Sequence, residues 1–110
     1  MSSQQRVIHG KLVRDRIPEI IGGSGQTAVV RTLSPDAYRS ALVVKLREEL
    51  DEFVASQDVA ELVDLVEVIQ AIVEDRRIDW QEFEVLRARK RGERGGFRDH
   101  VWLESVEHQE

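Results

Sequence analysis

Apolar residues recur every three or four positions through two long stretches of the chain, a spacing typical of amphipathic helices. The first stretch begins where Ser34 can cap a helix and a proline can fill its first turn, so a helix is predicted over about 35–55. A break at 56–57 ends it, and Asp58 can cap a second helix that extends to about Arg76. Apolar residues occupy most of the circumference of this second helix, so we expect neighbours to cover it on several sides.

The N-terminal third of the chain has weaker patterns. Residues 1–10 show no periodicity and are expected to form a flexible lead-in. Pro18 can open a short helix within the basic and apolar segment 11–21, and the glycine cluster that starts at Gly22 is expected to end it. Segment 27–33 is rich in β-branched residues and is expected to be extended, although one such segment cannot form a sheet by itself.

A third helix is predicted after Asp79, which can cap it with an acid three residues further on. This helix should reach about Arg91 and end before Gly92. The glycine-rich tail over 92–103 is expected to form a loop and a short extended piece. Three helices with short connections favour an all-α fold, a small bundle with a central helical hairpin and short extended segments at both ends.

Composition limits the size, the compartment and the available chemistry. A chain of 110 residues suits one domain with one modest core, so we predict a single domain over 1–110. No apolar run approaches the roughly 20 residues that cross a bilayer, and the N-terminus lacks the apolar segment of a signal peptide. We therefore expect a cytoplasmic protein with no membrane partner. The absence of cysteine excludes disulfides, thiolate nucleophiles and cysteine-bound zinc.

Charge is distributed unevenly around a net value of −5. Residues 1–31 carry five bases and two acids, residues 45–75 carry two bases and ten acids, and residues 76–98 carry eight bases and four acids. This pattern has no uniformly basic face, and with a pI near 5.3 it disfavours nucleic acid as a partner. An acidic centre between basic segments is suited to a metal-bound polyphosphate.

Helical geometry places four of the central acids beside apolar residues. At about 100° per residue, Glu49 borders the apolar stripe of the first long helix and Glu52 lies about 60° further round. On the second helix, Glu61 falls within the apolar face and Asp64 lies about 60° from it. In an antiparallel hairpin these carboxylates meet, and they repel one another unless a cation lies among them.

Hard oxygen ligands of this kind favour Mg²⁺ or Mn²⁺. The alternative is a solvated acidic face, which is common on helices. By the same geometry, two other acids lie on the outer surface, Asp51 and Glu67.

The central acids also form two motifs, Glu-Glu-x-x-Glu over 48–52 and Glu-x-x-Asp over 61–64. With these motifs the chain resembles the MazG-like all-α nucleoside triphosphate pyrophosphatases, which are related to the phosphoribosyl-ATP pyrophosphohydrolases. The opening segment KLVRDRIP over 11–18 and the segment RGGF over 94–97 resemble a subgroup of presumed house-cleaning enzymes. The resemblance covers about residues 11–103.

The resemblance implies Mg²⁺-dependent hydrolysis of a nucleoside triphosphate, presumed to be non-canonical, to a monophosphate and pyrophosphate by attack at the α-phosphorus. It implies metal ligation by four acids and an assisting or water-orienting role for a fifth, Glu48. The four implied ligands are Glu49, Glu52, Glu61 and Asp64. On physical grounds, bases near the acids can hold the phosphates, and Asp15 can orient one of them. The candidate bases are Lys11, Arg14, Lys90, Arg91 and Arg94.

Two other functions stay open on the sequence alone. One is phosphoribosyl-ATP hydrolysis on the same fold, and the other is a non-catalytic helical module for nucleotide sensing or protein interaction. A homodimer or homotetramer is expected, because the second long helix needs more cover than two other helices provide. The aromatic side chains can stack on a base but are more typical of a core in so small a domain, namely Tyr38, Trp80, Phe97 and Trp102.

Overall fold

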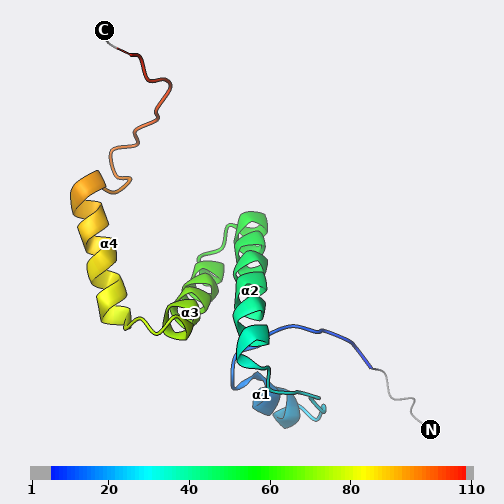
Figure 1. The fold of residues 1–110 in the computed structure, drawn as a ribbon. Helices are drawn as coiled ribbons and strands as arrows, with labels where there is room; N and C mark the ends of the chain where they lie inside the picture. The colour runs from blue at the N-terminus through cyan, green and yellow to red at the C-terminus, as the bar shows by residue number, and fades with distance from the viewer. Residues whose placement is uncertain (1–5, 109–110) are drawn as a thin grey trace.

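The computed structural model describes residues 6–108, and its regular structure is entirely helical (Figure 1). Its four helices are α1 (Ile17–Gly23), α2 (Pro35–Ser56), α3 (Val59–Asp75) and α4 (Trp80–Arg94). The predicted all-α class is therefore confirmed. Neither segment 27–33 nor the described part of the tail forms a strand. Half of the predicted flexible lead-in, residues 1–5, lies outside the described residues.

The three long helices begin at the capping residues that the sequence predicts. The Ser34 hydroxyl accepts a hydrogen bond from the Ala37 N–H at 3.2 Å. Asp58 and Asp79 cap α3 and α4 in the same way, accepting from the backbone N–H two residues ahead at 3.0 and 2.8 Å. Gln57 ends α2 in the left-handed region with φ 59°. Because α3 begins two residues later, the chain reverses direction with almost no loop.

Helix α1 ends within the glycine cluster that was expected to stop it, whereas α4 ends later than predicted. Helix α1 includes Gly22 and Gly23, and the hydroxyl of Ser24, the next residue, donates to the Ile21 carbonyl at 2.7 Å. Helix α4 passes through Gly92 to Arg94 and is followed by Gly95, which has φ 83°. The predicted stop before Gly92 was wrong because a glycine inside a helix costs only about 1 kcal/mol and does not end it. At Gly95 the backbone leaves the helix in a conformation that suits glycine.

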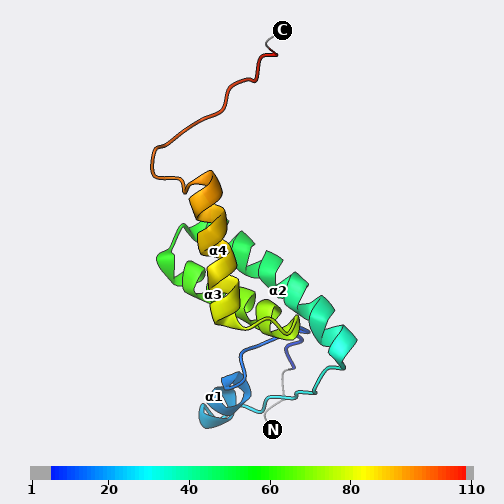
Figure 2. The same ribbon diagram turned by 60° about the vertical axis from the view of Figure 1, so that its left-hand side comes forward.

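Helices α2 and α3 form the packed part of the molecule and lie side by side in both views (Figures 1 and 2). An ion pair ties them together where α2 begins and α3 ends, with Arg39 Nε 3.0 Å from Asp75 Oδ2. The buried apolar side chains lie on these two helices, Leu42, Val68 and Val73. Although α2 packs along α3 and α4 contacts it, several apolar side chains of α3 remain exposed: Leu62, Val63 and Val66.

The molecule is elongated. Its radius of gyration is 20.1 Å, whereas a compact chain of this length has about 13 Å. Helix α4 contacts α3 but not α2, and the tail beyond it leads away from the helices (Figure 2). Phe97 is 97% exposed and Trp102 is 84% exposed, so their predicted place in a core was wrong for the single chain. Trp80 is half-buried and stacks on Phe83 at 5.2 Å between ring centroids.

Within residues 6–108, none of the helices combines the length and the apolar character that crossing a bilayer requires.

Candidate metal centre

Three carboxylates from α2 and α3 converge, those of Glu49, Glu61 and Asp64. One oxygen of each lies within 4.8 Å of the other two. Glu61 and Asp64 are three residues apart in the first turns of α3, a spacing that places both on one helix face. Glu49 comes from the facing helix. The structure thus brings together three of the four acids that were expected to bind metal.

Glu49 is the buried member of the group, with 6% of its surface exposed. Its Oε1 lies 3.1 Å from the Lys45 ammonium, whereas its Oε2 is buried and has no hydrogen-bond partner among the described residues. Burial raises the pKa of Glu49 above its ordinary value, the Lys45 contact lowers it, and the neighbouring Glu52 raises it. An unsatisfied buried polar atom costs about 1–3 kcal/mol, so Oε2 is a favourable ligand for a cation.

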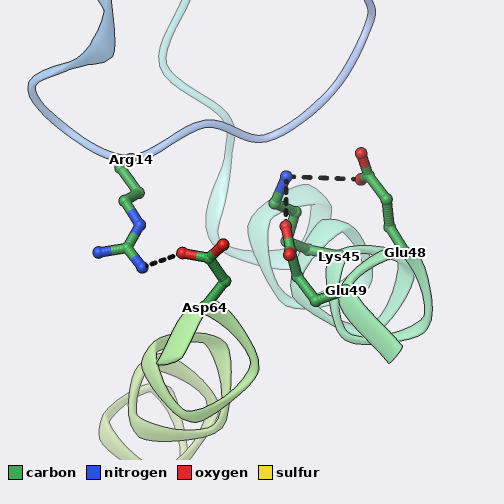
Figure 3. A network of polar contacts seen from close by, with 5 residues as sticks. All are labelled: Arg14, Lys45, Glu48, Glu49 and Asp64. Atoms are coloured by element: carbon green, nitrogen blue, oxygen red, sulfur yellow. Dashed lines mark hydrogen bonds and ion pairs between the residues drawn. The ribbon is translucent and has the colours of Figure 1, made fainter. Parts of the chain in front are cut away.

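Lys45 had no role assigned from the sequence. Its ammonium lies between two glutamates of its own helix, 3.1 Å from Glu49 Oε1 and 3.5 Å from Glu48 Oε2 (Figure 3). Burial lowers the pKa of Lys45, but hydrogen bonds and the negative charges of both glutamates outweigh it, so the pKa is raised. The contacts of Lys45 with Glu48 and Glu49 could have been predicted from the sequence, since residues three and four positions apart on a helix are neighbours.

Arg14 supplies a second cation from the segment before α1. Its Nη2 lies 2.6 Å from Asp64 Oδ1, on the other side of the Asp64 carboxylate from Lys45 (Figure 3). Arg14 was expected to contact phosphate with help from Asp15, but its partner in the structure is Asp64, an expected metal ligand. Asp15 itself is exposed and is one cause of the raised pKa of Tyr38, after burial and Asp75.

A cavity of about 200 Å³ lies between the N-terminal segment and α2. Its wall is mainly apolar, with two lysines and one glutamate, and consists of Gly10, Lys11, Leu12, Ala41, Val44, Lys45 and Glu48. Glu48, the expected water-orienting residue, therefore lines this cavity and pairs with Lys45 rather than joining the three carboxylates. Lys11 also lines the cavity, together with Lys45.

Glu52 is exposed and lies outside the group of three. It is nevertheless close to Glu49, because it contributes to the raised pKa of that residue. Its role as a metal ligand stays a prediction. Asp51 and Glu67 are exposed, as helical geometry predicted.

The expected phosphate-binding bases fall into two separate groups. Arg14 pairs with Asp64 and Lys11 lines the cavity with Lys45 and Glu48. The three bases of α4 are instead exposed on a helix that does not contact α2. No ion pair in the described part of the chain joins these α4 residues to the central acids: Lys90, Arg91 and Arg94. Arg91 and Arg94 instead line an open cavity of about 800 Å³ with Phe97 and Arg98.

The arrangement can hold a metal ion that prefers oxygen ligands. Three carboxylates carry more negative charge than Arg14 and Lys45 balance, and one buried oxygen has no protein partner. Repulsion among close carboxylates and the cost of burying Glu49 both decrease when a cation binds there.

Comparison with known proteins adds one partial match. A protein of Mycolicibacterium smegmatis described as uncharacterized is 59% identical over 46 residues, which are 42% of this chain and 47% of that protein. The matched segment thus spans about half the length of this relative. No protein-family model matches the chain, and no solved structure matches it.

Proposed function

We propose that the chain is a Mg²⁺-dependent nucleoside triphosphate pyrophosphohydrolase that converts a non-canonical NTP or dNTP to the monophosphate and pyrophosphate. The supporting observation is the partnerless buried oxygen of Glu49, which lies in a group of three carboxylates with Arg14 and Lys45 beside it. A site for a metal-bound polyphosphate needs ligands for the divalent cation and, beside them, bases that contact the phosphates. In this proposal, residues 1–110 form one domain, and its substrates come from the cytoplasmic nucleotide pool.

The residues divide the work as follows. Glu49, Glu61 and Asp64 hold the ion, with Glu52 as an exposed fourth ligand. When bound, Mg²⁺ neutralises charge on the phosphoryl oxygens as a Lewis acid. Glu48 accepts a proton from the water that attacks the α-phosphorus, while the bond from that phosphorus to the bridging oxygen of the pyrophosphate breaks. Lys45 pairs with Glu48 and Glu49 and would hold both carboxylates in place.

Assembly completes the proposed enzyme. We infer that α2 and α3 are the central hairpin of a helical bundle that a second copy covers, as a homodimer or within a homotetramer. Exposed apolar side chains on α3 and along the tail support this inference, because large exposed apolar surfaces usually mark interfaces. In such an assembly the bases of α4, which lie apart from the acids of their own chain, can serve the site of a neighbour.

A nucleotide panel tests the proposal directly. The 110-residue chain with Mg²⁺ is expected to release pyrophosphate from at least one canonical or modified NTP, and chelation of the metal should abolish the release. Glu61→Gln should lower turnover by about 100-fold, because it removes an ion ligand. Glu67→Gln, an exposed acid on the same helix, is the matched control and should retain turnover.

Absence of pyrophosphate release across the panel would contradict the proposal. The panel should include phosphoribosyl-ATP, since release from this compound alone would identify the alternative activity on the same fold.

A further inference from the structure

Arg14 forms an ion pair with a carboxylate that the proposed metal site needs as a ligand. Its guanidinium lies 2.6 Å from Asp64 Oδ1, and Asp64 is one of the three converging carboxylates. A divalent cation and the guanidinium therefore draw on the negative charge of the same side chain. Binding of the ion must weaken the attraction between Asp64 and Arg14, and Arg14 must weaken the attraction of the site for the ion.

Lys45 and Arg14 differ in how easily each side chain can leave its carboxylate partner. The Lys45 side chain is only 16% exposed and contacts two glutamates of its own helix. The Arg14 side chain is 50% exposed and has one acidic partner. Its backbone is anchored, since the Arg14 carbonyl accepts a hydrogen bond from the Ile17 N–H at 3.0 Å and the preceding Leu12 and Val13 are half-buried. Release from Asp64 thus requires only a side-chain rotation.

A phosphate group is a suitable second partner for Arg14. Guanidinium groups bind phosphate and carboxylate with the same planar set of donors, so one arginine can exchange between the two. Arg14 borders the acidic centre, and Lys11 of the same segment lines the adjoining cavity. A triphosphate bound through its metal ion at the three carboxylates would place its oxygens within the same region.

We propose that Arg14 is an exchangeable counterion of the metal centre. It neutralises Asp64 before the ion binds, and it transfers to the triphosphate when the ion takes over Asp64. This inference deepens the proposed function and rests on it for the identity of the anion. The consequence is that the site binds Mg²⁺ weakly by itself and more tightly together with a polyphosphate.

The chain supplies a matched control in the pair Arg39–Asp75. Arg39 Nε lies 3.0 Å from Asp75 Oδ2, so this pair has the same chemistry and also joins an arginine to α3. Asp75 is eleven positions after Asp64 on the helix, which corresponds to about 16 Å along the axis. That separation exceeds the Debye length of about 8–10 Å at moderate salt, so its charge has little effect on the acidic centre.

Calorimetric titration of the 110-residue chain tests the exchange. Mg²⁺ alone is expected to bind Arg14→Gln about fivefold more tightly than the natural chain, because a competing ion pair is lost. Mg²⁺-tripolyphosphate is expected to bind Arg14→Gln about tenfold more weakly, because a charged contact is lost. Arg14→Lys keeps the charge and should bind Mg²⁺ alone as the natural chain does. Arg39→Gln should change neither affinity.

Unchanged or weaker Mg²⁺ binding by Arg14→Gln would overturn the exchange, as would equal tightening by Arg39→Gln or no Mg²⁺ binding at all. These titrations contain no nucleotide and follow no turnover. The expected opposite shifts would therefore support the exchange even if the nucleotide panel showed no pyrophosphate release, an outcome that would refute only the proposed enzyme activity.

Discussion

Two arginine–aspartate pairs hold α3 to the rest of the chain, and they have different surroundings. Arg39 and Asp75 join the start of α2 to the end of α3. Arg14 joins the N-terminal segment to Asp64. The pair at Asp75 includes no member of the three-carboxylate group. Asp64 belongs to that group, together with Glu49 from α2 and Glu61 from α3.

The difference shows which feature distinguishes a candidate site from an ordinary ion pair. The contact itself does not, because both pairs are short and both arginines are at least half exposed. What differs is the excess of carboxylate oxygens around Asp64, one of which, Glu49 Oε2, is buried without a partner. Removing the Asp64 carboxylate should therefore impair the proposed function, whereas removing the Asp75 carboxylate should mainly lower stability.

The largest expected effect is on turnover. If the proposed activity is correct, Asp64→Asn should lower pyrophosphate release by about 100-fold, because it removes charge and a ligand from the proposed metal centre. Asp75→Asn should retain release within about twofold, since it lies about 16 Å further along α3. Steady-state rates at saturating Mg²⁺ measure both variants. Equal losses would show that the two pairs act alike and would remove the functional distinction between them.

Much of the fold could be predicted, because the signals that start a helix are local. Ser34, Asp58 and Asp79 cap the helices that the sequence predicts. The ends were less predictable, as Gly92 shows, because a glycine permits a helix stop without imposing one. The exposed positions of Phe97 and Trp102 could not be predicted, since aromatic composition does not reveal whether a single chain contains enough neighbours to cover a tail.

A smaller effect is expected on stability, and here the Asp75 substitution should matter more than the Asp64 substitution. Asp75→Asn should lower the free energy of unfolding by about 1 kcal/mol, because it breaks the contact that ties α2 to α3. Asp64→Asn should lower it less when divalent cations are chelated, because losing the Arg14 contact is offset by weaker repulsion from Glu49 and Glu61. Urea unfolding in a chelating buffer measures both. A greater loss from Asp64→Asn would show that Arg14 is chiefly a structural clasp.

The smallest expected effect concerns pH. Burial raises the pKa of Glu49 above its ordinary value of 4.5, so the folded chain binds this proton more tightly than the unfolded chain. Charged Glu49 therefore lowers stability above its folded pKa, and this penalty disappears as the pH falls to 4.5. Glu49→Gln should be more stable than the natural chain at pH 7 without divalent cations, and the difference should shrink towards pH 4.5.

Urea unfolding at a series of pH values measures this difference. Glu67→Gln is the control, because it removes the same charge from an exposed position. A stabilisation by Glu49→Gln that grows as the pH falls would contradict the assigned direction of the pKa.

The candidate site was predictable where helical geometry alone decides the position of a side chain. The angular positions of Glu49, Glu61 and Asp64 were enough to predict their meeting, given two antiparallel helices. The Arg14 contact was not predictable, because it crosses 50 positions in sequence and depends on how an irregular segment lies against α3. Lys45 could have been identified from its spacing to Glu48 and Glu49, which is the spacing of helix neighbours.

The chain has two tryptophans, and their contrasting environments allow the proposed assembly to be tested by fluorescence. Trp80 stacks on Phe83 at the start of α4, whereas Trp102 extends from the tail into solvent. In the isolated chain, a soluble quencher such as iodide would reach the second ring and largely spare the first. A copy that covers the tail would shift the emission of Trp102 to shorter wavelength and protect it from quenching, so titrating the protein concentration would report the association without any label.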